Sequence, residues 1–436
     1  MKTTKNNSVP IFIGKELGFK ILNPKSLILI CIFALGIGAA CAQDSIQDQI
    51  QTLKDEIKSL KSEEQTHFMV RGFTQFGLEA SDENINFNMT SFNPLLLWRQ
   101  GDRFLFEGEL EMEYMANQFR INLGYANASL IVSKGLVVRV GKFLIPFGTC
   151  VEKFHPSWIN KFVTMPLGVG HDGIAPISDI GVEIRGGLQL GKSKMNYSLY
   201  AVNGPGIKDG MEEPDEAGML SFENATDNNN NKAIGSRIGI LPLSNSSLEI
   251  GFSGYYAMPG AEESPFMGDT LNEDLNYKDV TASLAAVDLS FVKVISPLKG
   301  ILDIKGQYTL SNISDATYFN PEDTSRYTFT NNSMAYYAQL AYRPAMATNK
   351  VLQNLEVAGR YSVCNTPEGS LWHSKQSQIV LGLNYWIEWR TVIKINYQMT
   401  TIEREEMEEM PGMGSMTGTH SVADENMLFI HLAVGL

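Results

Sequence analysis

The sequence predicts an all-β fold, a transmembrane antiparallel β-barrel of about 16 strands. From His67 to Leu436, apolar and polar side chains alternate with a period of two, which gives an extended strand one apolar and one polar face. Most of these segments have about 10 to 15 residues, longer than the ~5 or 6 of a soluble sheet and long enough to cross a membrane. Short and long connections also alternate along the chain, as they do in outer-membrane barrels.

Residues 1–42 are predicted to be a cleaved signal peptide. Lysines precede the apolar run SLILICIFALGIGAA, and the small residues Ala40, Cys41 and Ala42 offer a cleavage site before Gln43. The apolar run is short for a membrane span, so a retained anchor is the weaker interpretation. Cys41 also suggests a lipoprotein cleavage site, but a glycine replaces the large aliphatic residue that usually lies three positions before the cysteine. We therefore expect export with simple cleavage.

Residues 43–66 form a second predicted segment with a different periodicity. Its apolar residues follow the heptad spacing of a helix, at Ile46, Ile50, Leu53, Ile57 and Leu60. So short a helix is marginal alone. One interpretation is a small periplasmic coiled coil that helps the protein to oligomerise, and the other is an amphipathic helix or a frayed spacer.

Residues 67–436 are predicted to form the barrel, and the stretch from Asp102 to Tyr114 shows its two faces most clearly. The sequence DRFLFEGELEMEY has apolar side chains at its even positions and glutamates at its odd positions. The glutamates are Glu107, Glu109, Glu111 and Glu113. Four carboxylates on one face require water, so this face is predicted to line a pore, beside Arg71 and Arg120 on neighbouring segments, while the other face contacts lipid.

The predicted connections separate into two classes. If the first strand leaves the periplasm, the periplasmic connections are short, at 99–102, 133–135, 191–194, 242–247, 295–298, 344–353 and 387–389. The opposite side has two short loops near 81 and 116 and then long loops at 144–177, 204–231, 259–277, 312–330, 365–375 and 402–424. A soluble sandwich gives no reason for such sorting, whereas an outer-membrane barrel does.

Six tyrosines share the apolar phase and lie toward the long-loop ends of their segments. They are Tyr114, Tyr256, Tyr308, Tyr336, Tyr361 and Tyr397. Single tyrosines are common in strands. Six with the same phase and the same end predict an aromatic girdle at the lipid headgroup layer.

The loop at 144–177 is long, rich in proline and aromatic residues and only mildly charged, so we expect it to be packed. A packed loop at this place can pack only inside the barrel. Its predicted constriction residues are Lys142, Pro146, Phe147, Glu152, Lys153, His155, Pro156, Trp158, Asn160 and Lys161.

Four motifs resemble the porin family that includes the phosphate-selective porins. They are RFLFEGELEME at 103–113, VGKFLIPFG at 140–148, HPSWINKF at 155–162 and YAVNG at 200–204. The resemblance implies a sixteen-stranded barrel in the outer membrane of a Gram-negative bacterium, a frequently trimeric assembly, and a third loop folded into the lumen as a constriction. The ladder of arginines and lysines on which phosphate selectivity depends in that family has no local counterpart in this sequence.

Charged residues of both signs have the inward phase. The predicted pore-lining residues are Arg71, Glu107, Glu109, Glu111, Glu113, Arg120, Arg139, Glu183, Arg185, Arg237, Lys305, Arg360 and Lys394, with further acids at Glu79, Glu249, Asp303 and Glu356. Such a mixture favours a channel with a transverse field over an anion trap. The simpler interpretation, which we expect to hold for most of them, is that these residues solvate the lumen and pair across strands.

The sequence indicates no cofactor, no metal site and no reaction. Met407, Met410, Met413 and Met416, followed by His420, could hold Cu(I), but an acidic loop of biased composition is the simpler interpretation. Residues 215–231 lack the spacing of a calcium loop, and His171 with Asp172 has no accompanying catalytic motif. The two cysteines beyond the signal peptide, Cys150 and Cys364, could pair or remain as thiols.

Taken as a whole, the sequence predicts an outer-membrane porin for passive diffusion of small hydrophilic solutes or ions. The net charge of −13 disfavours nucleic acid as a partner, because neutralising phosphates requires basic patches. One alternative is a substrate-specific anion channel of phosphate type with the same fold. Another is a non-conducting barrel that serves as an envelope tether or a platform for partners.

Overall fold

The computed structural model describes residues 51–55, 66–115, 118–170, 173–211, 213–222, 229–261, 277–319, 325–408 and 417–436. The chain divides into two units, Met1–Glu63 and Glu64–Leu436. Residues 51–55 of the first unit are helical, whereas the predicted signal peptide and the remainder of the heptad segment up to residue 65 lie outside the described residues. No helix among the described residues is both long and apolar enough to cross a membrane.

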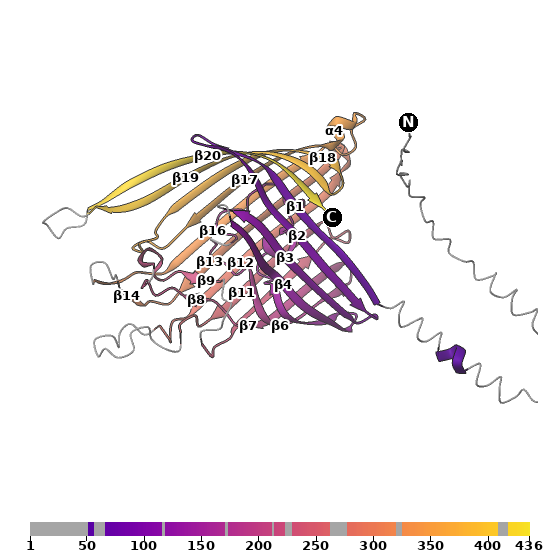
Figure 1. The fold of residues 1–436 in the computed structure, drawn as a ribbon, viewed down its shortest axis with the longest axis horizontal. Coiled ribbons are helices and arrows are strands. Elements are labelled where there is room, and N and C mark those ends of the chain that lie inside the picture. The colour runs from indigo at the N-terminus through magenta and orange to yellow at the C-terminus, as the bar shows by residue number, and fades with distance from the viewer. Residues whose placement is uncertain are drawn as a thin grey trace, which may run out of the picture. The chain divides into compact units, whose positions relative to one another are not determined.

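The second unit is a closed antiparallel barrel of 16 strands, as predicted (Figure 1). The strands, in the order in which they pair, are β1 (Thr66–Ser81), β2 (Ile85–Gln100), β3 (Phe104–Met115), β4 (Gln118–Ser133), β5 (Leu136–Leu144), β6 (Ser178–Leu190), β7 (Ser193–Val202), β10 (Ala233–Leu241), β11 (Leu248–Ala257), β12 (Ala282–Ile295), β13 (Gly300–Ile313), β16 (Asn332–Arg343), β17 (Leu355–Asn365), β18 (Lys375–Glu388), β19 (Thr391–Glu408) and β20 (Thr417–Gly435). Pairing of β1 with β20 closes the barrel, so the first and last strands have no free edge there.

The other elements lie in the connections. They are α3 (Cys150–Phe154), β8 (Gly206–Ile207), η1 (Pro214–Glu216), β9 (Leu220–Ser221), η3 (Ser296–Leu298), β14 (Thr317–Phe319), β15 (Arg326–Thr328) and α4 (Lys350–Asn354). The helix α4 begins where the side chain of Asn349 accepts hydrogen bonds from the backbone of Val351 and Leu352. We name the end of the barrel that carries the short connections, including α4, the short-turn end, and the opposite end the long-loop end.

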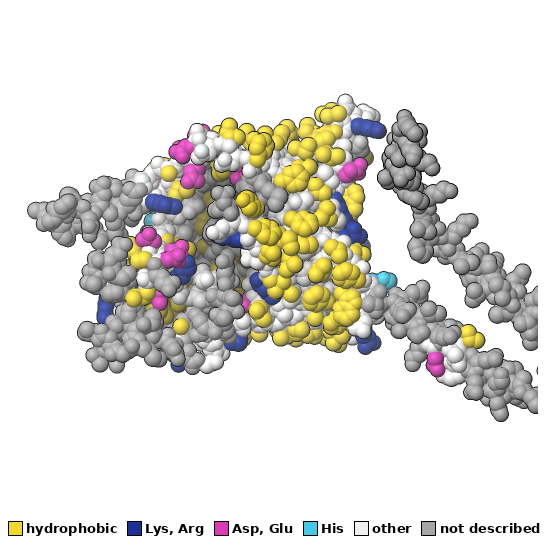
Figure 2. Space-filling view, in the orientation of Figure 1, with side chains coloured by type: hydrophobic (Ala, Val, Ile, Leu, Met, Phe, Trp, Pro, Cys, Tyr) yellow, Lys and Arg dark blue, Asp and Glu magenta, His cyan; other side chains and the backbone are white. Residues whose placement is uncertain are grey.

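The barrel wall has a polar inner face and an apolar outer face, and β13 illustrates both. Lys305, Gln307 and Thr309 are buried, whereas their neighbours Tyr308 and Leu310 are exposed. Exposed apolar side chains recur on the outer face of neighbouring strands, among them Val140, Val182, Leu199, Ile238, Phe252, Val287, Leu340, Val357 and Leu381. Figure 2 shows apolar side chains covering a continuous area of the wall, with charged side chains near the rim at either end. So large an exposed apolar area is typical of a wall in contact with lipid.

The predicted tyrosine girdle is on the outer face. Tyr114, Tyr256, Tyr308, Tyr361 and Tyr397 are each more than 40% exposed. Tyr336 is half-buried because it lies between two of them, with its ring centroid 6.3 Å from that of Tyr308 and 6.2 Å from that of Tyr361. These three rings, on the paired strands β13, β16 and β17, form a continuous aromatic row.

The predicted loop at 402–424 is too long. The strands β19 and β20 continue to Glu408 and from Thr417, and they reach far beyond the neighbouring strands at the long-loop end (Figure 1). Their register runs without a shift from Thr391, opposite Val434, to Glu408, opposite Thr417. The polar composition that predicted a loop is compatible with a two-stranded ribbon, because backbone pairing holds the ribbon and its described side chains at 403–404 and 422–425 are exposed. Of the predicted methionine and histidine cluster, Met410, Met413 and Met416 lie outside the described residues.

An apolar cluster lies on the inner face toward the long-loop end. It joins Phe143, Ile145 and Phe147 to inward-facing residues of the wall, including Tyr200 and Tyr255. Tyr318 and Phe329, which belong to another connection, pack in the same cluster with their ring centroids 5.0 Å apart. The inner face is therefore polar only over part of its length.

Candidate functional site

The candidate site is the segment 145–177, which joins β5 to β6 and contacts the inner face of the wall. It enters through Gly148, whose φ of +66° favours glycine and whose added Cβ would lie 2.1 Å from Oε1 of Gln307. The amide of Gly148 donates to Ser253 on β11, and the amide of Thr149 donates to Gln307 on β13. The short helix α3 follows.

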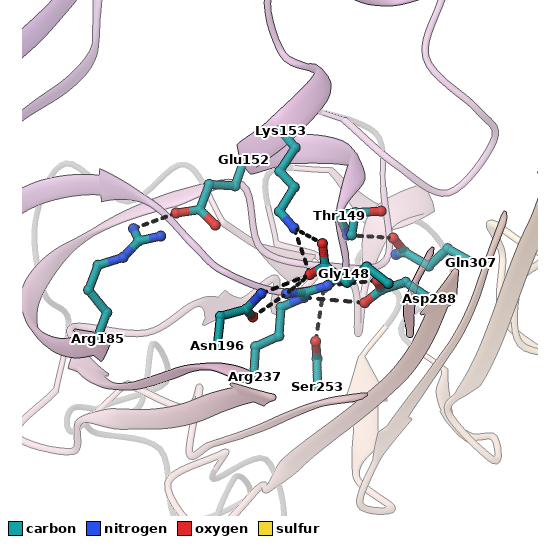
Figure 3. A network of polar contacts seen from close by, with 11 residues as sticks. Gly148, Thr149, Glu152, Lys153, Arg185, Asn196, Arg237, Ser253, Asp288 and Gln307 are labelled. Atoms are coloured by element: carbon teal, nitrogen blue, oxygen red, sulfur yellow. Dashed lines mark hydrogen bonds and ion pairs between the residues drawn. The ribbon is translucent and has the colours of Figure 1, made fainter. Parts of the chain in front are cut away.

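One set of ion pairs joins α3 to the strands β10, β11 and β12 (Figure 3). Nζ of Lys153 lies 2.6 Å from Oε2 of Glu249, and Oε1 of the same carboxylate accepts from the Arg237 guanidinium at 3.0 Å. The Arg237 guanidinium also donates to Asp288 at 2.7 Å. This alternating row of charges extends from the loop into the wall.

A second set joins α3 to β5 and β6. Oε1 of Glu152 accepts from Nη1 of Arg185 at 2.6 Å, as Figure 3 shows. Arg139, which is buried, lies between Glu152 and Glu183, with its Nε 2.5 Å from the Glu183 carboxylate. Adjacent residues of α3 thus bind opposite charges on different strands, Glu152 to arginine and Lys153 to glutamate.

A third set holds the middle of the loop on the far side of the barrel. Nζ of Lys161 lies 2.8 Å from the Glu356 carboxylate on β17. The ammonium of Lys394 on β19, which is fully buried, donates to the carbonyls of Ser157 and Phe162. The guanidinium of Arg360 donates to the carbonyl of Thr164 at 2.7 Å.

The loop also contacts the acidic strand β3, through His155. Its Nε2 lies 2.9 Å from Oε1 of Glu109 and 3.7 Å from Oε1 of Glu111. Burial lowers the pKa of His155, but the hydrogen bond to Glu109 and the charges of both glutamates raise it more, so the pKa lies above its ordinary value. The predicted basic neighbours of the strip, Arg71 and Arg120, are instead exposed.

Arg71 and Arg120 were predicted from phase alone. Arg71 stands opposite Leu95 on β2, which in turn stands opposite Glu109, whereas Arg120 lies near the start of β4. Arg71 donates its Nε to Met69, and Arg120 stands opposite Glu113 in the register of β3 and β4. The partner of Glu109 and Glu111 is His155, from a loop that is remote in sequence.

The apolar residues of the loop are packed as predicted. Pro146 and Phe147 are buried, and Phe162 is fully buried under the Arg360 guanidinium, 4.8 Å from its ring centroid. Trp158 is half-buried and packs against an apolar cluster at β18 and β20 that contains Trp386. Pro156 and Asn160 shape the turns between them: the carbonyl of Pro156 accepts from two backbone amides, and the Asn160 side chain accepts from the amide of Phe162.

Lys142 was assigned to the loop, and this is wrong. It belongs to β5, whose ladder with β6 continues to Leu144, and its Nζ donates to the carbonyl of Leu123 on β4. The cysteine pairing that the sequence left open is also decided: Cys150 and Cys364 are both buried free thiols.

Among the remaining predicted lumen residues, Lys305 contacts the loop through the ring of Phe154 in α3. Glu107 and Glu113 are half-buried, and the buried Lys305 is paired with Asp303 and lies 4.6 Å from the ring centroid of Phe154. A cavity of about 610 Å³ lies between the loop and the strands β1–β6, and its lining includes Glu111, Glu113, Lys142, His155 and Asp179. A larger cavity, of about 1140 Å³, lies toward β13, β16, β17 and β19.

Several residues that hold the loop were not predicted. The Asn396 side chain accepts from the amide of Val163 at 2.7 Å, Gln398 accepts from the Thr164 hydroxyl, and Asn384 donates to the carbonyl of Lys161. Asp288 was also missed. Their inward phase is visible in the sequence, but neutral amides on a polar face give no signal that distinguishes a loop ligand from a residue in water.

No protein-family model matches the chain, and no curated protein matches it. Three solved structures that it resembles are outer-membrane proteins. An anion-selective porin from Comamonas acidovorans has a TM-score of 0.50 and 12% identity, over 85% of this chain and 100% of that chain. The outer membrane channel DcaP of Acinetobacter baumannii has a TM-score of 0.51 and 11% identity, over 85% of this chain and 97% of that chain. A loop-deletion mutant of OmpT from Vibrio cholerae has a TM-score of 0.50 and 10% identity, over 85% and 100%.

The barrel has the porin fold. At 10–12% identity, the similarity to these structures establishes only the fold of the chain. The solute has to be inferred from the chemistry of the lumen. The porin fold agrees with the broader part of the resemblance found in the sequence. Membership of the family of phosphate-selective porins stays a prediction.

Proposed function

We propose that the protein is a passive outer-membrane channel for small hydrophilic solutes or ions, narrowed by the loop 144–177. The observation that carries the proposal is the distribution of the loop's polar contacts. They reach β3 through His155, β11 through Lys153, and β17 through Lys161, so the loop is bound on widely separated parts of the wall. A segment held in this way narrows the lumen and keeps a fixed passage beside it. The apolar outer wall supports a position in lipid.

We further propose that the passage beside β1–β6 favours cations. Much of the basic charge of the inner wall is occupied: Arg237 and Lys305 pair with acids, and Arg360 binds carbonyls of the loop. The cavity of about 610 Å³ has Glu111 and Glu113 in its lining. Carboxylates lining a narrow aqueous path attract cations and repel anions. This arrangement gives no support to an anion-specific channel.

The proposal includes the fate of the amino terminus. We propose that residues 1–42 direct export and are removed, that 43–66 form a short coiled coil, and that 67–436 form the barrel. The heptad spacing and the helical residues 51–55 support the coiled coil. A homotrimer is proposed from the sequence resemblance.

Single-channel conductance in planar bilayers tests the proposed constriction. Deleting residues 155–166 removes the contacts of His155, Lys161 and the Thr164 backbone with β3 and β17, while it keeps the turn at Gly148. We expect a higher conductance for the deletion variant, because its aqueous path is wider. The variant Lys208→Ala, which removes a half-exposed ammonium paired with Glu213 on another connection, should conduct like the native protein. Equal conductance for the deletion variant and the native protein would contradict the proposed constriction, and a native barrel that forms no pore would favour the non-conducting alternative.

A further inference from the structure

Two carboxylates of β3 and one imidazole of the loop meet at one point of the inner wall. The candidate ligand atoms of Glu109, Glu111 and His155 all lie within 4.8 Å of one another. Nε2 of His155 is 2.9 Å from Oε1 of Glu109 and 3.7 Å from Oε1 of Glu111. Ligand atoms bound to tetrahedral Zn²⁺ at ~2.0 to 2.2 Å are about 3.3 to 3.6 Å apart. The two distances to His155 differ from this spacing by a few tenths of an ångström, and the 4.8 Å span of the group exceeds it by about 1 Å, so side-chain adjustments of about 1 Å would bring these atoms onto one ion.

The local backbone makes room for Glu111. The register of β3 and β4 shifts between Glu109 and Leu110, so that Gly124 is an extra residue in β4. A Cβ at Gly124 would lie 2.7 Å from Oε1 of Glu111. The bulge and the absent side chain leave the space that the carboxylate uses when it turns toward His155.

The surroundings provide orientation and access. Nδ2 of Asn93, on the neighbouring strand β2, donates to Glu109 at 3.0 Å and fixes this carboxylate, as the groups around a metal ligand commonly do. Asn93 is 4% exposed, and its Oδ1 has no hydrogen-bond partner among the described residues. Asn93, Glu111 and His155 line the same cavity, so water or a further oxygen can complete the coordination.

We propose that Glu109, Glu111 and His155 form a binding site for a divalent transition-metal ion, with Zn²⁺ as the best-fitting probe. One imidazole nitrogen and two carboxylates are ordinary Zn²⁺ ligands. Ca²⁺ prefers six or more oxygens, which three side chains including a histidine do not offer. A bound ion would link the loop directly to β3. Binding of the metal does not depend on whether the barrel conducts.

Calorimetric titration of the full chain in detergent micelles with Zn²⁺ tests the site. We expect saturable Zn²⁺ binding that His155→Gln and Glu111→Gln each weaken by about tenfold or more. Glutamine at 155 keeps a group that can donate to Glu109, so this variant retains the contact between the loop and the wall. Ca²⁺ should not compete. Far-UV circular dichroism confirms that each variant retains its β-structure.

Two matched variants complete the experiment. Glu113→Gln removes a carboxylate of the same strand and the same cavity, and His67→Gln removes an exposed imidazole of β1; both should bind Zn²⁺ like the native protein. Absence of saturable Zn²⁺ binding to the native protein would overturn the proposal. Affinity that is unchanged by both His155→Gln and Glu111→Gln would overturn it as well, since the ion would then be bound elsewhere.

Discussion

The exposure and the thiol pKa of Cys150 depend on how tightly the loop is packed. The residue is 5% exposed in α3, and its Sγ lies 4.0 Å from Sδ of Met165. Burial raises the pKa of the Cys150 thiol from 9.0 to about 11. The folded state holds the thiol proton more tightly than the unfolded chain does. The contribution of this buried thiol to the free energy of unfolding is therefore fully present below about pH 9, and it is lost as the pH rises through about 11.

We therefore predict slow alkylation of Cys150 at pH 8. In a variant in which Cys31, Cys41 and Cys364 are replaced by serine, the rate of labelling by iodoacetamide should rise steeply toward pH 11, because the thiolate is the nucleophile. The same variant unfolded in urea should show the rise near pH 9. Mass spectrometry of timed samples gives both profiles. Rapid labelling of the folded protein at pH 8 would show that the loop is not packed over this residue.

At the scale of elements, the loop is held by ion pairs that are themselves largely removed from solvent. The side chains of Lys161 and Glu356 are 13% and 5% exposed, and Asn384 supplies a further donor to the carboxylate. Such a pair adds little net stability compared with an apolar pair, but loss of one partner leaves an uncompensated charge at a cost of about 3 kcal/mol or more. Because loops generally open at a lower free energy than the strands of a sheet, we expect this cost to act on release of the loop from the wall.

We predict that Lys161→Met increases chymotrypsin cleavage within the loop by about a hundredfold, since about 1.4 kcal/mol corresponds to a factor of ten. Phe154, Trp158 and Phe162 provide the cleavage sites. The increase in cleavage rate of the double variant Lys161→Met with Glu356→Gln should be smaller than the product of the increases measured for the two single variants. The reason is that the double variant leaves neither the ammonium nor the carboxylate buried without its partner. Lys208→Met, which breaks an exposed ion pair of another connection, should leave the rate unchanged. Multiplicative effects of the two substitutions would show that Lys161 and Glu356 are not coupled.

The fold could be predicted because each strand carries its own evidence. The alternation in β13 is legible from its residues alone, since lipid on one side and water on the other act at every position. The loop contacts could not be predicted in the same way. Lys161 and Glu356 are 195 residues apart, and inward phase does not reveal which of many carboxylates an ammonium will reach. Phase also does not show how far a side chain is exposed: Arg71 stands in the same register row as Glu109, with Leu95 between them, yet it is exposed.

At the scale of the whole molecule, the charges of the lumen are separated by the loop. On β10 to β13 the basic groups Arg237 and Lys305 are paired with acids of the wall. On the opposite side, Glu111 and Glu113 line an open cavity. His155 and Lys142 line it too, and Arg120 stands opposite Glu113 in the register of β3 and β4. We propose that this acidic passage, rather than a transverse field across the whole lumen, sets the selectivity of the channel, which should then depend on few residues.

We predict that Glu111→Gln with Glu113→Gln lowers the permeability ratio of K⁺ to Cl⁻ by a few-fold. A unit charge ~8 Å from the path of an ion contributes about 0.5 kcal/mol in water, which screening by ~0.15 M salt reduces to about 0.2 kcal/mol, with opposite signs for cation and anion. The reversal potential in a KCl gradient measures the ratio, and EDTA keeps the wall free of divalent metal. The control Asp102→Asn with Glu388→Gln removes the same number of carboxylates at the exposed short-turn end, where screening is strongest, and should change the ratio less. A native channel with strong anion preference, or a ratio unaffected by the first pair of substitutions, would return Glu111 and Glu113 to the role of solvating the wall.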